Sequence, residues 1–320
     1  MARKIALALD WTPNTNHTGF YVSLAKGWYA EVGIELSIVP PSDLYCKEET
    51  PARKVVNGLA DFCIAPSESV ISCWTSDPAK VKPIVVATLL QHDTSAIVTK
   101  ATSSVKTLAE LDKKLYASYE GRFEMAIVQQ MIRQAGGMGE AIETTPPKLD
   151  CFDAVMRGDA EATWVFMAWE GVMAEMKGVE LNVFDLKTSG VPYGYSPVLL
   201  AHPDMLSADN GTLLQSFLAV TQRGYQFATE QPEAAAICLM ETAQHHALTE
   251  LGQEMIIKSQ QYLSNGNYYL HPSGEWGTME TTRWVAFLDW LATNKLLVYR
   301  DGTTVPREAL REDEMCNRLV

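Results

Sequence analysis

Apolar runs of strand length alternate with helical patterns through about the first 200 residues. Each run is followed by polar or turn-forming residues, which is typical of buried strands that end at a connecting loop. The runs are 5–9, 34–39, 60–65, 82–90, 95–99, 115–119, 161–166, 181–184 and 198–201. Strands that alternate with helices in this way predict an α/β protein with mostly parallel sheets.

Helical patterns occupy most of the segments between these runs and dominate the chain after about residue 210. In the last of them Trp284, Phe287 and Trp290 recur at helical spacing, so we expect these aromatic side chains to belong to the core. The predicted helices are 20–29, 52–59, 70–74, 107–111, 120–134, 148–156, 169–176, 212–230, 234–242, 248–263 and 278–297.

Two segments about one hundred residues apart have a similar pattern. Residues 58–62 (Gly-Leu-Ala-Asp-Phe) and 158–162 (Gly-Asp-Ala-Glu-Ala) each begin with glycine, continue with a small residue and an acid, and enter a strand. Each follows a strand-helix-strand-helix pattern. This internal repeat predicts two lobes of similar construction.

Composition describes a folded protein and restricts its partners. Hydrophobic residues make up 47% of the 320 residues and charged residues 20%, which are globular proportions. The net charge of -13 argues against nucleic acid and anionic membrane surfaces as partners, because both attract basic patches. The net charge does not exclude a small anionic ligand, since one pocket can be locally positive.

The apolar runs also bear on location. None approaches the length of a membrane span, so no transmembrane segment is predicted. The run 5–9 is too short for the core of a secretory signal peptide, and no cleavage region follows it. As written, the chain is expected to be cytoplasmic. Removal of a signal sequence would make the same chain periplasmic or extracellular.

The cysteines do not form a recognisable framework. None lies in a C-x-x-C pair or beside a histidine at zinc-finger spacing, so neither a disulfide framework nor a metal cage is expected. Most are expected to be buried small hydrophobic residues. They are Cys46, Cys63, Cys73, Cys151, Cys238 and Cys316.

The first strand leads into a turn rich in functional groups. The run 5–9 ends at Asp10, and Trp11 with a series of small polar residues follows before the first helix. A strand, a polar turn and a helix make up the usual site at the carboxyl end of a parallel strand, where helix amides face a ligand. Trp11 adds a surface on which a flat ring can stack.

Several segments in this order carry a family resemblance. They are 9–14 (Leu-Asp-Trp-Thr-Pro-Asn) with His17, 25–29 (Ala-Lys-Gly-Trp-Tyr), 32–35, 58–61, 107–111 and 116–121. With these pieces the chain resembles the NMT1/THI5-like (SsuA/THI5-like) family of the periplasmic-binding-protein superfamily over about residues 4–230. That family includes bacterial periplasmic binding proteins for thiamin pyrimidine precursors and fungal thiamine pyrimidine synthases.

The resemblance implies a two-lobe, type II periplasmic-binding-protein fold with the ligand in the cleft between the lobes. Residues 1–95 and 200–320 would form lobe one, and residues 96–199 lobe two. The two crossings of the chain, near Ser95 and Pro197, would form the hinge.

The synthase branch of the family resembles a protein that consumes its own lysine-bound pyridoxal phosphate and a histidine, with a cysteine-rich stretch for iron. The corresponding turn here, 64–69, has neither lysine nor histidine, and 191–196 has no cysteine. An imine needs an amine, and soft iron ligation needs thiolates or imidazoles. The sequence therefore favours a binding protein over an enzyme, with no cofactor and no bound metal.

In the first lobe, ligand contacts are expected from three segments. Each residue has an alternative role: Trp11 could plug the turn, His17 could cap the helix, Tyr21 could pack in the core, and Glu68 could be a solvated residue beside a capped helix. A carboxylate such as that of Glu68 can accept a hydrogen bond from the amine of an aminopyrimidine. The candidates are Trp11, Asn14, His17, Tyr21, Ser67, Glu68, Ser69 and Gln91.

In the second lobe, Gly121 would let backbone amides approach a ligand, and Arg122 could meet a phosphate or carboxylate. Trp164 is a candidate for a second stacking wall, with core packing as the alternative. The candidates in this lobe are Glu120, Gly121, Arg122, Trp164 and Tyr193.

These observations lead to one main hypothesis, non-catalytic binding of a small planar heterocycle such as a thiamin pyrimidine precursor. The alternatives are an enzyme of thiamin pyrimidine synthesis on the same scaffold and a binder of a sulfonate or another organic anion. The expected partners are the small ligand and a permease of an ABC transporter.

Overall fold

The computed structural model describes residues 2–41, 50–76, 80–299 and 301–317, and it divides into two compact units. Unit 1 comprises residues 1–93, 195–284 and 308–320, and unit 2 comprises residues 94–194 and 285–307. Relative to the predicted lobes, unit 2 begins at residue 94, unit 1 resumes at residue 195, and residues 285–307 group with unit 2. Cys46 lies outside the described residues.

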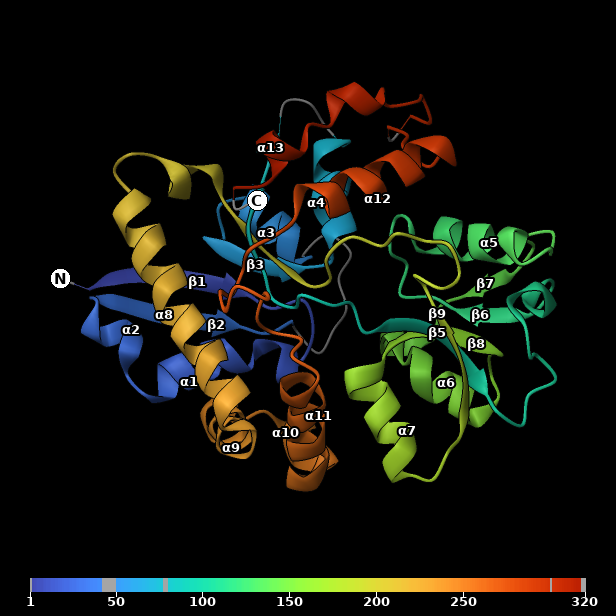
Figure 1. The fold of residues 1–320 in the computed structure, drawn as a ribbon, viewed down its shortest axis with the longest axis horizontal. Helices are drawn as coiled ribbons and strands as arrows, with labels where there is room; N and C mark the ends of the chain where they lie inside the picture. Colours follow the sequence, from blue (N-terminus) through green and yellow to red (C-terminus); the bar gives the residue numbers. More distant parts are fainter. Residues whose placement is uncertain (1, 42–49, 77–79, 300, 318–320) are drawn as a thin grey trace. The chain divides into compact units, whose positions relative to one another are not determined.

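Unit 1 contains a five-stranded sheet in the order β2-β1-β3-β10-β4 (Figure 1). β1 pairs in parallel with β2 and β3, whereas β10 runs antiparallel to both β3 and β4. Four of the five strands therefore point in one direction. The strands are β1 (Arg3–Ala8), β2 (Ile34–Val39), β3 (Phe62–Ala65), β4 (Ile84–Thr88) and β10 (Val198–Ala201).

The helices of unit 1 pack on this sheet and on one another. α1 packs against α8 and α9, and α3 lies beside β3 and α4. The helices are α1 (Thr18–Ala25), α2 (Trp28–Glu31), α3 (Pro51–Val56), α4 (Ser67–Trp74), α8 (Gly211–Glu230), α9 (Pro232–Ala243), α10 (His246–Leu251), α11 (Gln253–Asn265) and α13 (Glu312–Met315), with short turns η1 (Thr15–His17), η6 (Pro203–Leu206) and η7 (Arg307–Ala309).

The core of unit 1 is aromatic. The rings of Phe62 and Phe217 are stacked with their centroids 4.4 Å apart, and those of Tyr225 and Trp276 are stacked at 4.7 Å. Phe20 lies edge-on to both Tyr225 and Trp276. All five side chains are fully buried, so they join β3, α1, α8 and the segment before α12 (Thr281–Thr293) through one apolar cluster.

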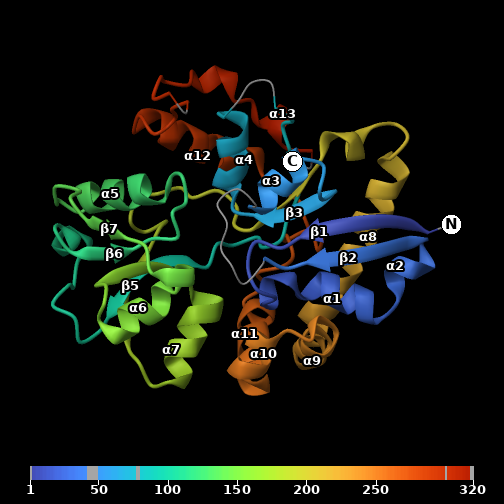
Figure 2. The same ribbon diagram turned by 180° about the vertical axis from the view of Figure 1, so that it is seen from behind.

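Unit 2 contains a second five-stranded sheet, in the order β7-β6-β8-β5-β9 (Figures 1 and 2). Its strands are β5 (Ser95–Lys100), β6 (Leu115–Ala117), β7 (Ile142–Thr144), β8 (Ala162–Phe166) and β9 (Leu181–Asp185). Its helices and turns are η3 (Leu108–Leu111), α5 (Glu124–Gln134), η4 (Pro147–Leu149), α6 (Cys151–Arg157), the π-helical turn η5 (Met167–Gly171) and α7 (Val172–Met176).

Both sheets follow one plan, as the internal repeat predicted. In unit 1 the central strand β3 pairs in parallel with β1 and antiparallel with β10. In unit 2 the central strand β8 pairs in parallel with β6 and antiparallel with β5. The repeated acids occupy matching places: the Asp61 amide donates to Ala6 O and the Glu161 amide to Leu115 O. The predicted α/β class with mostly parallel sheets is confirmed.

Two helices expected to be continuous are each broken at a glycine. The predicted helix 20–29 is α1 and α2, separated at Gly27, and the predicted helix 248–263 is α10 and α11, separated at Gly252. The φ angles of these glycines are 72° and 83°, a region that side-chain-bearing residues rarely adopt. The strand β7 was not predicted, because its three residues carry no alternating apolar pattern.

Other expectations concern the cysteines and the membrane. Cys63, Cys73, Cys151, Cys238 and Cys316 are free thiols. Over the described residues, no helix combines the length and the apolar character that a membrane crossing would require.

The contact between α1 and α8 predicts an asymmetry between two glycines of α8. A Cβ atom at Gly224 would lie 2.0 Å from Gly19 O and 2.4 Å from Ser23 Oγ, whereas one at Gly211 would meet nothing within 4 Å. We expect Gly224→Ala to lower the free energy of unfolding by at least about 2 kcal/mol. Gly211→Ala, the matched control, should be neutral or stabilising by up to about 1 kcal/mol. Calorimetric unfolding of both variants checks this, and equal stability would contradict the close approach of the two helices.

Candidate functional site

Functional groups gather at the carboxyl edge of the unit 1 sheet. β1, β3 and β4 end at this edge, and the antiparallel β10 begins there. The loops are joined by hydrogen bonds, from the Ser67 amide to Tyr195 O (3.0 Å) and from the Leu89 amide to Pro197 O (3.0 Å). The turn after β1, the start of α4 and the segment at Gln91 therefore lie at one edge, as their sequence positions predicted.

The turn after β1 is built around His17. The Asn14 amide donates to His17 Nδ1 (3.2 Å), and His17 Nε2 lies 2.8 Å from Asp10 Oδ1. Because Nδ1 accepts, the hydrogen on the neutral ring resides on Nε2, which donates to Asp10. His17 is fully buried with both ring nitrogens used within the turn. It therefore holds the turn, in place of the ligand contact that the sequence suggested.

Asn14 also has a structural role in this turn. Its side-chain oxygen accepts from the Asn16 amide (2.9 Å), and its side-chain amide donates to Thr12 O (3.0 Å). Asn14 thus caps η1 in a reciprocal capping box with His17. Its side chain is used within the turn and is 7% exposed, so the predicted ligand contact of Asn14 becomes a capping contact.

Groups from the distant helices hold the turn from behind. Tyr225 on α8 donates to Asn16 O (2.6 Å), and Tyr269 donates to Thr15 O (2.8 Å). The hydroxyls of Thr15 and Ser259 on α11 share a hydrogen bond of 2.7 Å. These contacts join the turn to segments more than two hundred residues later in the chain.

Trp11 and Tyr21 differ in exposure. Trp11 is half-buried, so part of its surface stays open at the carboxyl edge. Tyr21 is 4% exposed within α1, and burial raises the pKa of its phenol. Tyr21 therefore packs in the core, which was the alternative weighed for it.

The start of α4 contains a buried hydroxyl without a partner. Ser67 is fully buried, and no described residue forms a hydrogen bond with its Oγ. Glu68, in the first helical turn, is 9% exposed, and Ser69 is half-buried. A buried hydroxyl left unpaired costs free energy, so the Ser67 hydroxyl is a group that a ligand or an ordered water would satisfy.

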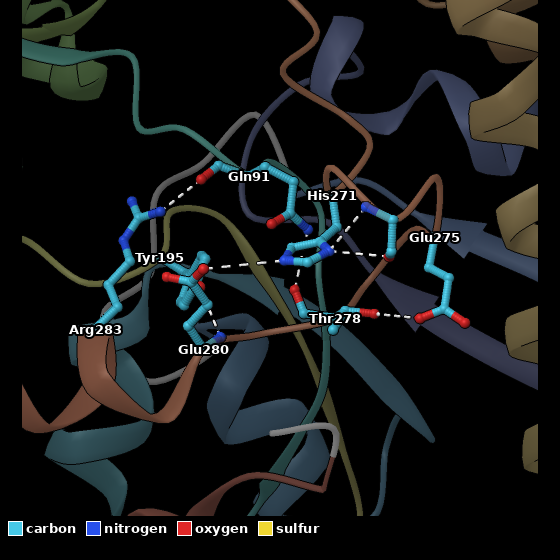
Figure 3. A network of polar contacts seen from close by, with 8 residues as sticks. Gln91, Tyr195, His271, Glu275, Thr278, Glu280 and Arg283 are labelled. Atoms are coloured by element: carbon cyan, nitrogen blue, oxygen red, sulfur yellow. Dashed lines mark hydrogen bonds and ion pairs between the residues drawn. The ribbon is translucent and has the colours of Figure 1, made fainter. Parts of the chain in front are cut away.

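Gln91 belongs to a polar network that Figure 3 shows. Its side-chain amide donates to Thr278 O (3.0 Å), and its backbone carbonyl accepts from the Arg283 guanidinium. Arg283 also lies 4.1 Å from the ring of Tyr195, whose hydroxyl accepts from the Glu280 amide (2.9 Å). Gln91 is 5% exposed, so it fixes the loop after β4 and presents little surface to a ligand.

In unit 2 the loop after β6 is organised by a carboxylate that the sequence analysis did not single out. Glu124, at the start of α5, accepts hydrogen bonds from Tyr116 Oη (2.9 Å), Ser118 Oγ (3.2 Å) and the Gly121 amide (3.1 Å). Burial raises the pKa of Glu124, although these bonds oppose the rise. The Gly121 amide is therefore committed to Glu124, contrary to the expected approach of this amide to a ligand.

The neighbours of Gly121 lie outside the core. Glu120 adopts a φ of 61° and its amide donates to Ser118 Oγ (2.9 Å), while Arg122 is exposed and donates to Val298 O. Arg122 thus holds the segment 285–307 to the rest of unit 2.

A second carboxyl lies at the end of β8. Glu170, in the π-helical turn η5, accepts from the Phe166 amide (2.9 Å). Burial raises the pKa of Glu170 to about 7, the hydrogen bond from Phe166 opposes the rise, and Asp153 adds to it. Burial and then the charge of Glu170 raise the pKa of Tyr119. Short π-helical segments and shifted carboxyls both concentrate at functional sites.

Trp164 and Tyr193 lie against each other inside unit 2. Their ring centroids are 5.4 Å apart in an edge-on arrangement, and Tyr193 lies 5.2 Å from Phe287 of α12. Trp164 is 7% exposed and Tyr193 6%, so both belong mainly to the core. Phe287 and Trp284 are fully buried, which confirms their predicted place in the core.

Several of the residues selected from the sequence therefore hold the loops at the carboxyl edge of the unit 1 sheet through hydrogen bonds within the protein. Asp10 and Glu170 were not among the selected residues, although an acid directly after a buried strand was a readable signal for Asp10. Glu170 had no such signal, since the π-helical turn that shapes it is not visible in the sequence pattern. No three histidine, cysteine, aspartate or glutamate side chains gather into a metal-binding group within the described ranges.

Comparison with known proteins identifies the family. The model of the family described as NMT1/THI5 like matches residues 14–235. The chain belongs to the NMT1/THI5-like family. The match runs from the turn after β1 to the first residues of α9, which agrees with the resemblance seen in the sequence.

Two sequence relatives of this family member have different names. The chain is 24% identical to the formylaminopyrimidine-binding protein of Halalkalibacterium halodurans over 290 residues, which are 90% of this chain and 84% of that protein. It is also 24% identical to the 4-amino-5-hydroxymethyl-2-methylpyrimidine phosphate synthase of Legionella pneumophila, over 82% of this chain and 80% of the synthase.

Solved structures show the fold. The periplasmic aliphatic sulphonate binding protein SsuA of Escherichia coli superimposes with a TM-score of 0.67 at 15% identity, over 92% of this chain and 94% of SsuA. This confirms the predicted periplasmic-binding-protein fold of the family member.

Glu170 predicts a specific dependence of stability on pH. A carboxyl has a pKa of about 4.3 when unfolded, so a folded pKa of about 7 means that ionisation opposes folding. The destabilisation is absent well below pH 4, grows as the pH rises to about 7, and is constant above. We expect E170Q to exceed the wild type in free energy of unfolding by about 1–3 kcal/mol at pH 8 and by little at pH 4.

Denaturation at the two pH values measures this difference. Glu175→Gln is the matched control, because Glu175 is exposed on the neighbouring α7 and its replacement should leave both values unchanged. A pH-independent effect of E170Q would show that the Glu170 carboxyl does not titrate near neutrality in the folded protein.

Proposed function

We propose that this protein binds a small planar heterocycle, an aminopyrimidine related to the precursors of thiamin, and releases it unchanged. The observation that carries the proposal is the half-buried Trp11 beside fixed polar groups at the carboxyl edge of β1. An exposed indole face binds a flat ring by stacking, and rigid hydrogen-bonding groups around it select the substituents of the ring.

The charge of the edge supports a neutral or cationic ligand. Asp10 and Glu68 both contribute carboxyl groups there, and Arg283 is engaged with Gln91 O and the ring of Tyr195. An aliphatic sulfonate, the ligand in the name of the SsuA relative, would bring a negative charge toward these carboxyls. The name of the relative from H. halodurans supports the pyrimidine class.

The second candidate function is synthesis of a thiamin pyrimidine, because one relative is named as such a synthase. The turn 64–69 has no amine for an imine with pyridoxal phosphate, and 191–196 has no thiolate for iron. Visible absorbance of the purified protein from a lysine imine or from iron would support the synthase and contradict the binder.

We further propose that the protein works in the periplasm or outside the cell and delivers its ligand to a permease of an ABC importer. The expectation of a cytoplasmic protein is not supported by the comparisons, since the E. coli relative is named as periplasmic. The lobe arrangement implied by the family, with residues 1–95 and 200–320 against residues 96–199, and its interlobe ligand, stay predictions.

Thermal stabilisation by 4-amino-5-hydroxymethyl-2-methylpyrimidine tests the binding function. At 100 times its Kd, a ligand that binds only the folded protein adds about 2.7 kcal/mol to stability. We expect this pyrimidine to stabilise the protein without being consumed, and an aliphatic sulfonate to have no effect. Stabilisation by the sulfonate alone would instead support an organic-anion binder.

Replacement of the stacking residue gives a sharper test. We expect Trp11→Ala to weaken binding of the pyrimidine about tenfold or more, because stacking on an aromatic ring contributes about 1–3 kcal/mol. Trp28→Ala is the matched control, since Trp28 is also half-buried in unit 1 but its ring lies under the Arg223 guanidinium at 3.7 Å. Calorimetric titration of both variants measures the Kd, and equal losses would refute a stacking role for Trp11.

A further inference from the structure

Asp10 is an acidic side chain in a fixed orientation at the carboxyl edge of the unit 1 sheet. Leu9, the first residue after β1, still pairs with β2 because its amide donates to Val39 O (2.9 Å). Asp10 is the next residue. β1 is an interior strand, so Asp10 does not lie at an exposed side of the sheet. Its side chain is 22% exposed, which leaves a restricted opening to the carboxylate.

One oxygen of this carboxylate is already paired. Oδ1 accepts from His17 Nε2 at 2.8 Å, and His17 is kept in that tautomer because its Nδ1 accepts from the Asn14 amide. The turn that carries His17 is itself held by Tyr225 and Tyr269. The direction of the Asp10 carboxylate is therefore set before any ligand arrives.

The other oxygen has no partner in the part of the chain that the structure describes. Neither a hydrogen bond nor a lysine or arginine engages Oδ2 within those ranges. An ionised carboxylate only accepts hydrogen bonds. A hydrogen bond to a partly enclosed carboxylate is stronger than one to a carboxylate in bulk water. A ligand group that contacts Oδ2 must therefore be a hydrogen-bond donor. The proposed stacking residue, Trp11, directly follows Asp10 in the chain.

We propose that Asp10 is the specificity-determining residue of this site, that it accepts a hydrogen bond from an exocyclic amino group of the ring, and that His17 is its positioning residue. This inference rests on the proposed pyrimidine-binding function. It predicts that the protein discriminates a 4-amino from a 4-oxo ring, since a carbonyl oxygen at the same place would face Oδ2 with two acceptors and no hydrogen.

A pair of ligands and the substitution Asp10→Asn test the inference. The ligands are 4-amino-5-hydroxymethyl-2-methylpyrimidine and its 4-oxo counterpart, and calorimetric titration measures the Kd of each. The amide side chain of D10N would still accept from His17 through its oxygen but would present an NH₂ donor where Oδ2 lies in the wild type. We expect the wild type to prefer the amino ligand at least tenfold, and D10N to reduce that preference at least tenfold.

Asp204→Asn is the matched control. Asp204 also lies beside a histidine, with 3.4 Å between its Oδ2 and His202 Nδ1, but it is 84% exposed and follows the far end of β10. D204N should keep the wild-type ratio of the two Kd values. An unchanged ratio in D10N would overturn the role of Asp10.

Two variants of His17 separate positioning from folding. Position 17 is the third residue of a capping box, where glutamine and glutamate are the usual acceptors for the capping amide. His17→Gln can accept from Asn14 and donate to Asp10, so it should keep the preference for the amino ligand. His17→Glu can cap but meets Asp10 with a second acceptor, so it should lose at least tenfold of the preference.

Equal preferences in H17Q and H17E would overturn the positioning role, and a fold check by circular dichroism accompanies both. If H17E does not fold, the comparison of D10N with D204N still decides the role of Asp10. Failure of the wild type to bind either ring would overturn the proposed function, and this inference with it. Binding of both rings with equal affinity would overturn this inference alone.

Discussion

The close contact between α1 and α8 determines the geometry of the unit 1 edge. Gly224 leaves no room for a side chain against Gly19 O, and the ring of the next residue, Tyr225, covers Gly19. This approach lets the Tyr225 hydroxyl reach Asn16 O, and the same ring stacks on Trp276 in the core. The turn after β1 is thus attached to the most tightly packed part of unit 1.

That attachment explains how a polar turn can be rigid. The Asn14 backbone amide, the His17 ring and the Asp10 carboxylate form a chain of hydrogen bonds, and the Asn14 side chain caps the same turn. A buried network of this kind is stable when its members are satisfied, and among the described residues the atom left without a protein partner is the partly exposed Oδ2 of Asp10. The fully buried hydroxyl of Ser67, on the neighbouring α4, is a second unsatisfied group at the same edge. Unpaired acceptors and hydroxyls beside a half-buried indole suit recognition of a flat, amino-substituted ring.

The two units apply one topology to different chemistry. Both sheets have the same arrangement of strand directions, with one antiparallel strand in the fourth position. In both, buried or half-buried side chains hold the loops at the carboxyl ends of the strands. In unit 1 the capping side chains are amide and imidazole groups, whereas in unit 2 they are the carboxyls of Glu124 and Glu170. Burial raises the pKa of both carboxyls, and both accept hydrogen bonds within unit 2. Relatives named as a binding protein and as a synthase are each 24% identical to this chain, so overall identity does not distinguish between these two functions.

Periodicity and turn chemistry alone determined the α/β class, most strands and the internal repeat, because these depend on local pattern. The family came from the resemblance of particular segments to known family members. The same patterns also indicated the turn after β1 as a candidate functional segment. They did not distinguish the residues that would contact a ligand from those that hold the turn, since Asp10, Asn14 and His17 are all polar and lie within eight residues of one another. Only tertiary structure decided that His17 and Asn14 face inward, that Tyr21 packs in the core and that Glu170 is half-buried and accepts a hydrogen bond from the Phe166 amide. The physical reason is that burial and hydrogen-bond partners come from α8, α11 and residue 269, which meet the turn only when the chain is folded.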